Sequence, residues 1–122
     1  MTAKRNMTSA EMEAQVLEKI DQYVNKDFPE AKRLHDIIMQ AEPSLCPRLW
    51  YGMPGYAKTK DSAVLVYFSK WRYITFGMSE SVDLVVPEGA TDKLVPYGWQ
   101  FDTLDEATEK RIAEIVRNAV AS

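Results

Sequence analysis

The amino-acid sequence predicts an α+β fold in which helices flank an antiparallel β-sheet. Residues 47–78 are rich in aromatic and β-branched residues, which favour strands. Helical periodicity and capping signals occupy both ends of the chain. The connections within residues 47–78 are too short to join parallel strands, which need a long crossover. We therefore expect a sheet of about four strands, two N-terminal helices and one C-terminal helix.

Two helices are expected before the sheet. Thr8 and Glu11 match the capping box S/T-x-x-E, and the apolar period that follows predicts a helix over residues 8–25. Asp27 is the expected N-cap of a second helix, which should end at about Ala41.

The third helix is expected at the C-terminus. Thr103 and Glu106 match a second capping box, which predicts a helix over residues 104–121. Glu109 is expected on its solvated side. The spacing of its apolar residues predicts this buried stripe: Ile112, Ile115, Val116 and Ala119.

The strands are predicted from short apolar runs bounded by turn residues. Met53-Pro54-Gly55-Tyr56 places Pro and Gly where a type II turn needs them, so we expect a turn there. Thr59–Ser62 and Ser69–Arg72 are expected to connect the later strands. The expected strands cover residues 48–51, 63–69 and 73–78, with an edge strand at 98–102.

The second of these strands is apolar on both faces, which predicts a central position in the sheet. Strict alternation places Val64, Val66 and Phe68 on one face and Leu65 and Tyr67 on the other.

Residues 79–97 give weaker signals. We expect a short helix or an irregular strand over residues 81–86 and one helical turn over residues 92–95.

Length and composition predict a single domain over residues 1–122, with residues 1–7 as a loose tail. The net charge of −3 argues against nucleic acid and anionic membranes as partners. A single cysteine indicates a reducing compartment, and neither a signal peptide nor an apolar run of about 18 residues is visible. We therefore expect a cytoplasmic protein.

The motif Tyr51-Gly52-Met53-Pro54 follows an aromatic residue, with two helices before it and strands reaching Phe68 and Phe76-Gly77 after it. In this the chain resembles the YdhG-like family of small bacterial proteins. The resemblance implies an α+β fold and, through one branch of the family, a frataxin-like iron chaperone. Such a protein would bind iron weakly and deliver it to iron–sulfur or haem assembly proteins. The segment after the third strand, VPEGATDKLVPYGWQFDTLDEAT, departs from the family pattern.

An iron site, if present, is expected on the first helix. Glu11, Glu18 and Asp21 share a face, and hard cations prefer oxygen ligands. The alternative is an ordinary solvated face with acid near the helix N-terminus, where the dipole favours it.

His35 and Cys46 are the other candidates for chemistry. His35 could form a ligand cluster with Met39 and Glu42, but a packing role is favoured. Cys46 could be a nucleophile, and the alternative is a structural thiol. The sequence contains no catalytic motif, so an enzyme is not expected.

The aromatic residues suggest a different class of function, a binding module. They could line a pocket for a small molecule or a protein partner, or they could simply form the core. Lysine and arginine accompany them, so the sheet region is basic while the helices are acidic. This polarity would allow two copies to meet as a homodimer. The candidate binding residues are Trp50, Tyr51, Met53, Pro54, Tyr56, Trp71 and Tyr73.

Overall fold

The computed structural model describes residues 7–122 and has the predicted α+β class. The expected tail, residues 1–7, lies outside the described part except for Met7. The sheet has five strands rather than four. In chain order the elements are α1 (Ser9–Asn25), α2 (Glu30–Ala41), β1 (Cys46–Trp50), β2 (Met53–Ala57), β3 (Val64–Lys70), β4 (Ile74–Met78), β5 (Gly98–Phe101) and α3 (Glu106–Ala121).

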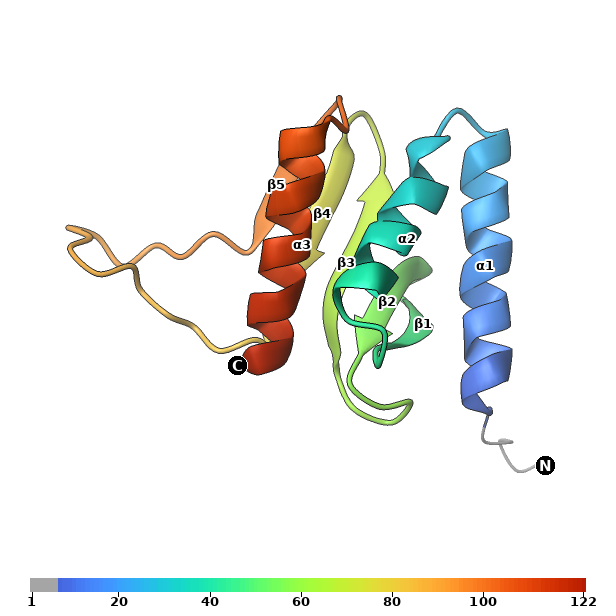
Figure 1. Ribbon diagram of the computed structural model, residues 1–122, viewed down its shortest axis with the longest axis horizontal. Coiled ribbons are helices and arrows are strands. Elements are labelled where there is room, and N and C mark those ends of the chain that lie inside the picture. Colours follow the sequence, from blue (N-terminus) through green and yellow to red (C-terminus); the bar gives the residue numbers. More distant parts are fainter. Residues whose placement is uncertain (1–6) are drawn as a thin grey trace.

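The sheet is an antiparallel meander in the order β1-β2-β3-β4-β5. The three helices lie side by side on one face of it, with α2 in the middle (Figure 1). β3 is the central strand, as its apolar character on both faces predicted. This arrangement divides the sheet into a face covered by helices and a face without them.

The core lies between the helices and the sheet. Its largest fully buried side chains are aromatic and come from the α1–α2 turn, β2, β3 and β4: Phe28, Tyr56, Phe68 and Phe76. The predicted stripe of α3 is buried, and Val16 and Leu34 supply the buried faces of α1 and α2.

The turn predicted at Met53–Tyr56 is wrong, because these residues form β2. The chain reverses two residues earlier, at Tyr51 and Gly52, which have φ values of 51° and 78°. Positive φ at both central residues is the arrangement of a type I′ turn, whose twist matches a two-residue hairpin. Pro54 is tolerated in β2 because the pairs with β3 begin only at Gly55.

The strict alternation expected for β3 is also wrong at its start. A bulge between β2 and β3 places Ala57 opposite Val64 where Tyr56 is opposite Val66. As a result Leu65 joins the core with Val66, while Val64 lines a pocket on the other side of the sheet.

The caps of the helices are confirmed for α1 and corrected for the others. Thr8 and Glu11 form the predicted capping box. Asp27 does not cap α2: it has φ 73° and lies in the α1–α2 turn, a conformation that Asp tolerates better than most residues. The turn buries Phe28, whose N–H donates to the Tyr23 carbonyl.

α3 begins later than predicted. Its N-cap is Asp105, whose carboxylate accepts the Thr108 N–H at 2.9 Å, so Thr103 and Glu106 do not form a capping box. Glu109 is not simply solvated, because it accepts from Arg33 of α2 at 2.6 Å and joins the two helices.

Residues 79–97 contain no helix or strand, so the helical turn predicted at 92–95 is wrong and so is any regular element at 81–86. The segment projects beside β5 (Figure 1). The Tyr97 hydroxyl donates to the Val82 carbonyl at 2.6 Å, and Val82 is buried in the core. The two ends of the 79–97 segment are therefore fixed, while the middle of the segment exposes apolar side chains.

Candidate functional site

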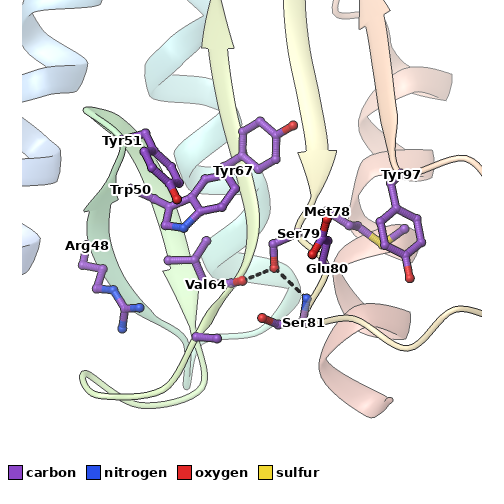
Figure 2. A pocket seen from close by; sticks show the side chains of 11 residues that line it. Arg48, Trp50, Tyr51, Val64, Tyr67, Met78, Ser79, Glu80, Ser81 and Tyr97 are labelled. Carbon is purple, nitrogen blue, oxygen red and sulfur yellow. Dashed lines mark hydrogen bonds between the residues drawn. The ribbon is translucent and has the colours of Figure 1, made fainter.

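The face of the sheet opposite the helices carries a pocket of about 690 Å³. β1, the β1–β2 turn and β3 form one side of it, and the segment after β4 forms the other (Figure 2). It is lined by Arg48, Trp50, Tyr51, Ala63, Val64, Tyr67, Met78, Ser79, Glu80, Ser81 and Tyr97.

One wall of the pocket is aromatic. The Trp50 ring lies 4.8 Å from the Tyr51 ring, edge to face at 73°, and 4.9 Å from the Tyr67 ring at 41°. These are centroid separations of directly contacting rings. Trp50 and Tyr67 are only partly buried and Tyr51 is 86% exposed, so the wall keeps accessible ring surface.

Two glycines make room for this wall. Gly77 is paired with Tyr67 across β3 and β4, and a Cβ on Gly77 would lie 2.6 Å from the Tyr67 hydroxyl. A Cβ on Gly55 would lie 3.0 Å from the Trp50 Cβ. The rings can therefore lie close against the sheet because the strands beneath them lack side chains at these points.

The opposite side of the pocket is polar. The buried Ser79 hydroxyl donates to the Val64 carbonyl and accepts the Ser81 N–H, the latter at 3.2 Å. These bonds attach the start of the 79–97 segment to the bulge of β3 (Figure 2). Glu80 and Ser81 are exposed beside it, where a ligand can reach them.

Arg48 closes one end of the pocket. Its guanidinium donates to the Lys60 carbonyl at 3.0 Å and to the Ser62 carbonyl. The 58–63 loop is further held by Thr59 and Ser62, which bond each other, so the polar turn predicted there is confirmed. Arg48 thus fixes the loop at the edge of the pocket.

Tyr51 has a backbone conformation that is unfavourable for its residue type, with φ 51°. A bulky side chain at positive φ is uncommon, and Asn or Gly is preferred at this position of the turn. Its ring is nevertheless almost fully exposed at the pocket wall. Packing therefore does not explain why an aromatic residue occupies this position.

The candidate binding residues predicted from the sequence are only partly brought together. Trp50 and Tyr51 line the pocket. Tyr56 and Pro54 are buried, and Tyr56 faces α2. Trp71 is 97% exposed at the β3–β4 tip, next to the exposed Tyr73, and Met53 is partly buried; none of the three lines the pocket.

The other lining residues of the pocket were not among the candidates predicted from the sequence. Tyr67 was recognised only as a strand residue, and Arg48 as a strand end. Ser79, Glu80 and Tyr97 come from the segment whose structure was not predictable from periodicity. The available signal was the pair Tyr67 and Gly77, since a glycine within an aromatic strand often marks a close approach.

His35 packs against the sheet, in agreement with the favoured interpretation. Its Nδ1 lies 2.8 Å from the Tyr56 hydroxyl, and the two rings are in contact. Burial lowers the pKa of His35, although Asp36 and Glu13 act in the opposite direction. Burial raises the pKa of Tyr56 well above its usual value. The pair is a hydrogen-bonded contact between α2 and β2, and burial favours the neutral form of both side chains.

The carboxylates proposed for iron are not gathered into a site. Within residues 7–122, no group of three or more His, Cys, Asp or Glu side chains is placed to hold a metal ion. Glu11 accepts the Thr8 N–H at 3.1 Å as part of the capping box, while Glu18 and Asp21 are exposed on α1. Iron binding at Glu11, Glu18 and Asp21 stays a prediction.

Cys46 begins β1 and is half-buried, with its Sγ 4.0 Å from the Lys58 carbonyl oxygen. The one histidine of the chain is engaged with Tyr56. This placement fits a structural thiol.

No helix within residues 7–122 has the length and apolar character needed to cross a membrane. No family model, no curated protein and no solved structure matches the chain.

Proposed function

We propose that this protein is a binding module for a small planar molecule, which is held in the pocket on the helix-free face of the sheet. The volume of about 690 Å³ lies in the range of small-molecule sites. The aromatic wall supplies stacking surface, and Arg48, Glu80 and Ser81 supply polar groups at the rim. A planar ring with hydrogen-bonding groups on one edge matches a pocket that has an aromatic wall and a polar rim.

Binding rather than catalysis fits the polar groups of the pocket. The Ser79 hydroxyl is already bonded to the Val64 carbonyl, and Arg48 is bonded to two carbonyls of the 58–63 loop. Both side chains hold the walls in place. This assignment makes the pocket a preformed receptacle, which lowers the entropy lost on binding.

The observation that carries the proposal is Tyr51. An exposed aromatic ring at positive φ is disfavoured by its backbone and gains little from burial. The Tyr51 ring contributes little to folding, and a contact with a bound ligand would give it a function.

The test is a ligand-observed NMR screen of ring-containing fragments against the wild-type protein and two variants. Tyr51→Asn removes the ring but suits the turn, and Trp71→Ala removes an exposed tryptophan outside the pocket. We expect hits that lose about tenfold or more in affinity in Tyr51→Asn, which corresponds to about 1.4 kcal/mol. The same hits should bind Trp71→Ala unchanged.

The proposal fails if the screen yields no fragment that binds the pocket on the helix-free face of the sheet. It also fails if Tyr51→Asn binds every hit as tightly as the wild type does.

A further inference from the structure

The free edge of β5 has main-chain groups directed away from the molecule. The Met78 N–H donates to the Tyr97 carbonyl at 2.6 Å, and Trp99 is paired with Phe76. In an antiparallel ladder the residues that bond a given neighbour alternate. Tyr97, Trp99 and Phe101 therefore bond β4, while Gly98 and Gln100 present their N–H and C=O groups outward.

This edge lacks the features that usually prevent strand pairing. Free edges are commonly protected by proline, charged residues or bulges. The opposite edge strand, β1, contains Pro47 and Arg48. β5 contains neither a proline nor a charge, and its pairs with β4 run without a bulge. Pro96 precedes it and Asp102 follows it, so only a short register is open.

We propose that a second copy of this chain pairs with β5, antiparallel, about a two-fold axis at Trp99. This register sets Gly98 opposite Gln100 of the partner subunit, and the reverse. All four outward N–H and C=O groups on each strand are then used. Registers centred on Gly98 or Gln100 would pair only two of these groups within β5, and the others would have to pair with Pro96, which has no N–H, or with the charged Asp102.

The same register buries apolar surface on the helix side. Trp99 and Phe101 line a hollow of about 350 Å³ between β5 and α3, together with Phe76, Ile112 and Ile115. Residues opposite one another without hydrogen bonds approach most closely. Trp99 would therefore pack against Trp99 of the partner subunit, in the space between the two copies of α3.

The projecting segment 79–97 supplies further contact. Antiparallel pairing directs residues 94–97 toward the start of α3 in the other copy. Leu94, which is 81% exposed, would then lie beside Leu104 of the partner subunit. A pair of four-residue strands buries too little for a stable dimer, so this contact and the Trp99 seam are required. The interface lies away from the aromatic wall of the pocket, although Tyr97 belongs to both the pocket lining and the contacting segment. The proposed dimer does not require the proposed ligand.

The experiment is sedimentation velocity over a protein concentration series, combined with amide hydrogen exchange by NMR. We expect a species of twice the 13.9 kDa chain mass at high concentration. We also expect protection of the Gly98 and Gln100 amides that rises with concentration. A monomer at all concentrations overturns the proposal, and so does a series of larger assemblies, because a two-fold interface closes at two copies.

Two variant pairs locate the interface. Gln100→Pro removes an outward N–H without removing a bond to β4 and should give a monomer, while Gln100→Thr should stay dimeric. Leu94→Glu should weaken the dimer about tenfold, whereas Leu84→Glu changes an exposed leucine elsewhere in the segment and should not. The second pair decides the matter if Gln100→Pro fails to fold. A dimer unaffected by Leu94→Glu and by a folded Gln100→Pro contradicts the β5 interface.

Discussion

At the scale of single residues, His35 and Tyr56 form the polar contact at the centre of the helix–sheet interface. Tyr56 is fully buried and its hydroxyl meets Nδ1 of the only histidine in the chain. A buried hydroxyl without a partner is costly, so each residue satisfies the other. Their environment combines Asp36 and Lys32 of α2, Glu13 of α1 and the hydroxyl of β2.

This contact predicts a pH dependence of folding stability. The pKa of His35 is lowered from 6.5 in the folded state, so below pH 6.5 the unfolded chain binds the proton more readily. The free energy of unfolding should therefore be constant above pH 6.5 and fall as the pH drops through 6.5. Denaturant titrations between about pH 5 and 8 measure this, since carboxylates titrate mainly below that range.

Two variants separate the effect of His35 titration on stability from the effect of the His35–Tyr56 hydrogen bond. His35→Asn keeps a polar group near the Nδ1 position but does not titrate, so it should abolish the slope. Tyr56→Phe should keep the slope and lower the free energy of unfolding by about 1 to 2 kcal/mol at every pH. A slope that survives in His35→Asn would assign the acid sensitivity to other groups.

Ser79 gives a second prediction at this scale. Its buried hydroxyl serves both the Val64 carbonyl and the Ser81 N–H, so Ser79→Ala should lower the free energy of unfolding by about 1 to 2 kcal/mol. Ser81→Ala, at an exposed position, should change it by less than about 0.5 kcal/mol. Equal effects of the two substitutions in chemical denaturation would show that the Ser79 bonds do not hold the segment.

At the scale of elements, the β1–β2 hairpin shows where sequence reasoning ends. Pro54-Gly55 is an ordinary turn signal, but Tyr51-Gly52 forms the turn and Pro54 lies in a strand. The turn signal is local, whereas the choice between the two positions depends on packing across β1, β2 and β3. The bulge that turns Val64 toward the pocket has the same origin, because it depends on the register of two strands.

The helices were more predictable because their determinants lie within the helices themselves. The capping box of α1 and the buried stripe of α3 need only residues three or four positions apart. The cap of α2 differs from the prediction because the burial of Phe28 decides the chain path there. The cap of α3 differs because Asp105 is a competing local N-cap that bonds the Thr108 N–H.

Substitutions of the two turn residues, Tyr51 and Gly52, should have opposite effects on the free energy of unfolding. Tyr51→Asn should leave the free energy of unfolding equal to the wild type or raise it by up to about 1 kcal/mol. Relief of positive φ outweighs the loss of a largely exposed ring contact. Gly52→Ala meets no neighbouring atom, so it should lower stability by about 1 kcal/mol through φ alone. Thermal unfolding of both variants checks this, and a clear loss of stability in Tyr51→Asn would mean that the ring serves folding.

At the scale of the whole molecule, the placement of all three helices on one face decides what the protein can bind. The candidate aromatics appeared in the sequence as a single cluster, but the sheet sends Tyr56 into the core and Trp71 to a tip. Only Trp50 and Tyr51 of the predicted set reach the pocket. Four of the eleven lining residues are 79–81 and 97, which the fold brings beside β3 from outside the predicted cluster.

Iron carriage stays a prediction of the family resemblance, and it can be separated from the pocket. The resemblance predicts saturable Fe(II) binding in the micromolar range, which anaerobic calorimetry of the wild-type protein measures. The matched variant is Glu11→Gln/Glu18→Gln/Asp21→Asn, which keeps the capping box intact. Saturable binding by the wild type that the variant loses would support the carrier function and place an iron site on α1, whereas no binding by the wild type would contradict it.

The most direct test of the proposed pocket uses the three tryptophan indole N–H signals in an NMR titration with a bound fragment. Trp50 lies in the pocket, Trp71 at the exposed tip and Trp99 on the helix side of β5. We predict that the Trp50 signal shifts with the amides of residues 79–81, while the Trp71 and Trp99 signals stay in place. A shift confined to Trp71 or Trp99, with Trp50 unchanged, would contradict a binding site on the helix-free face of the sheet.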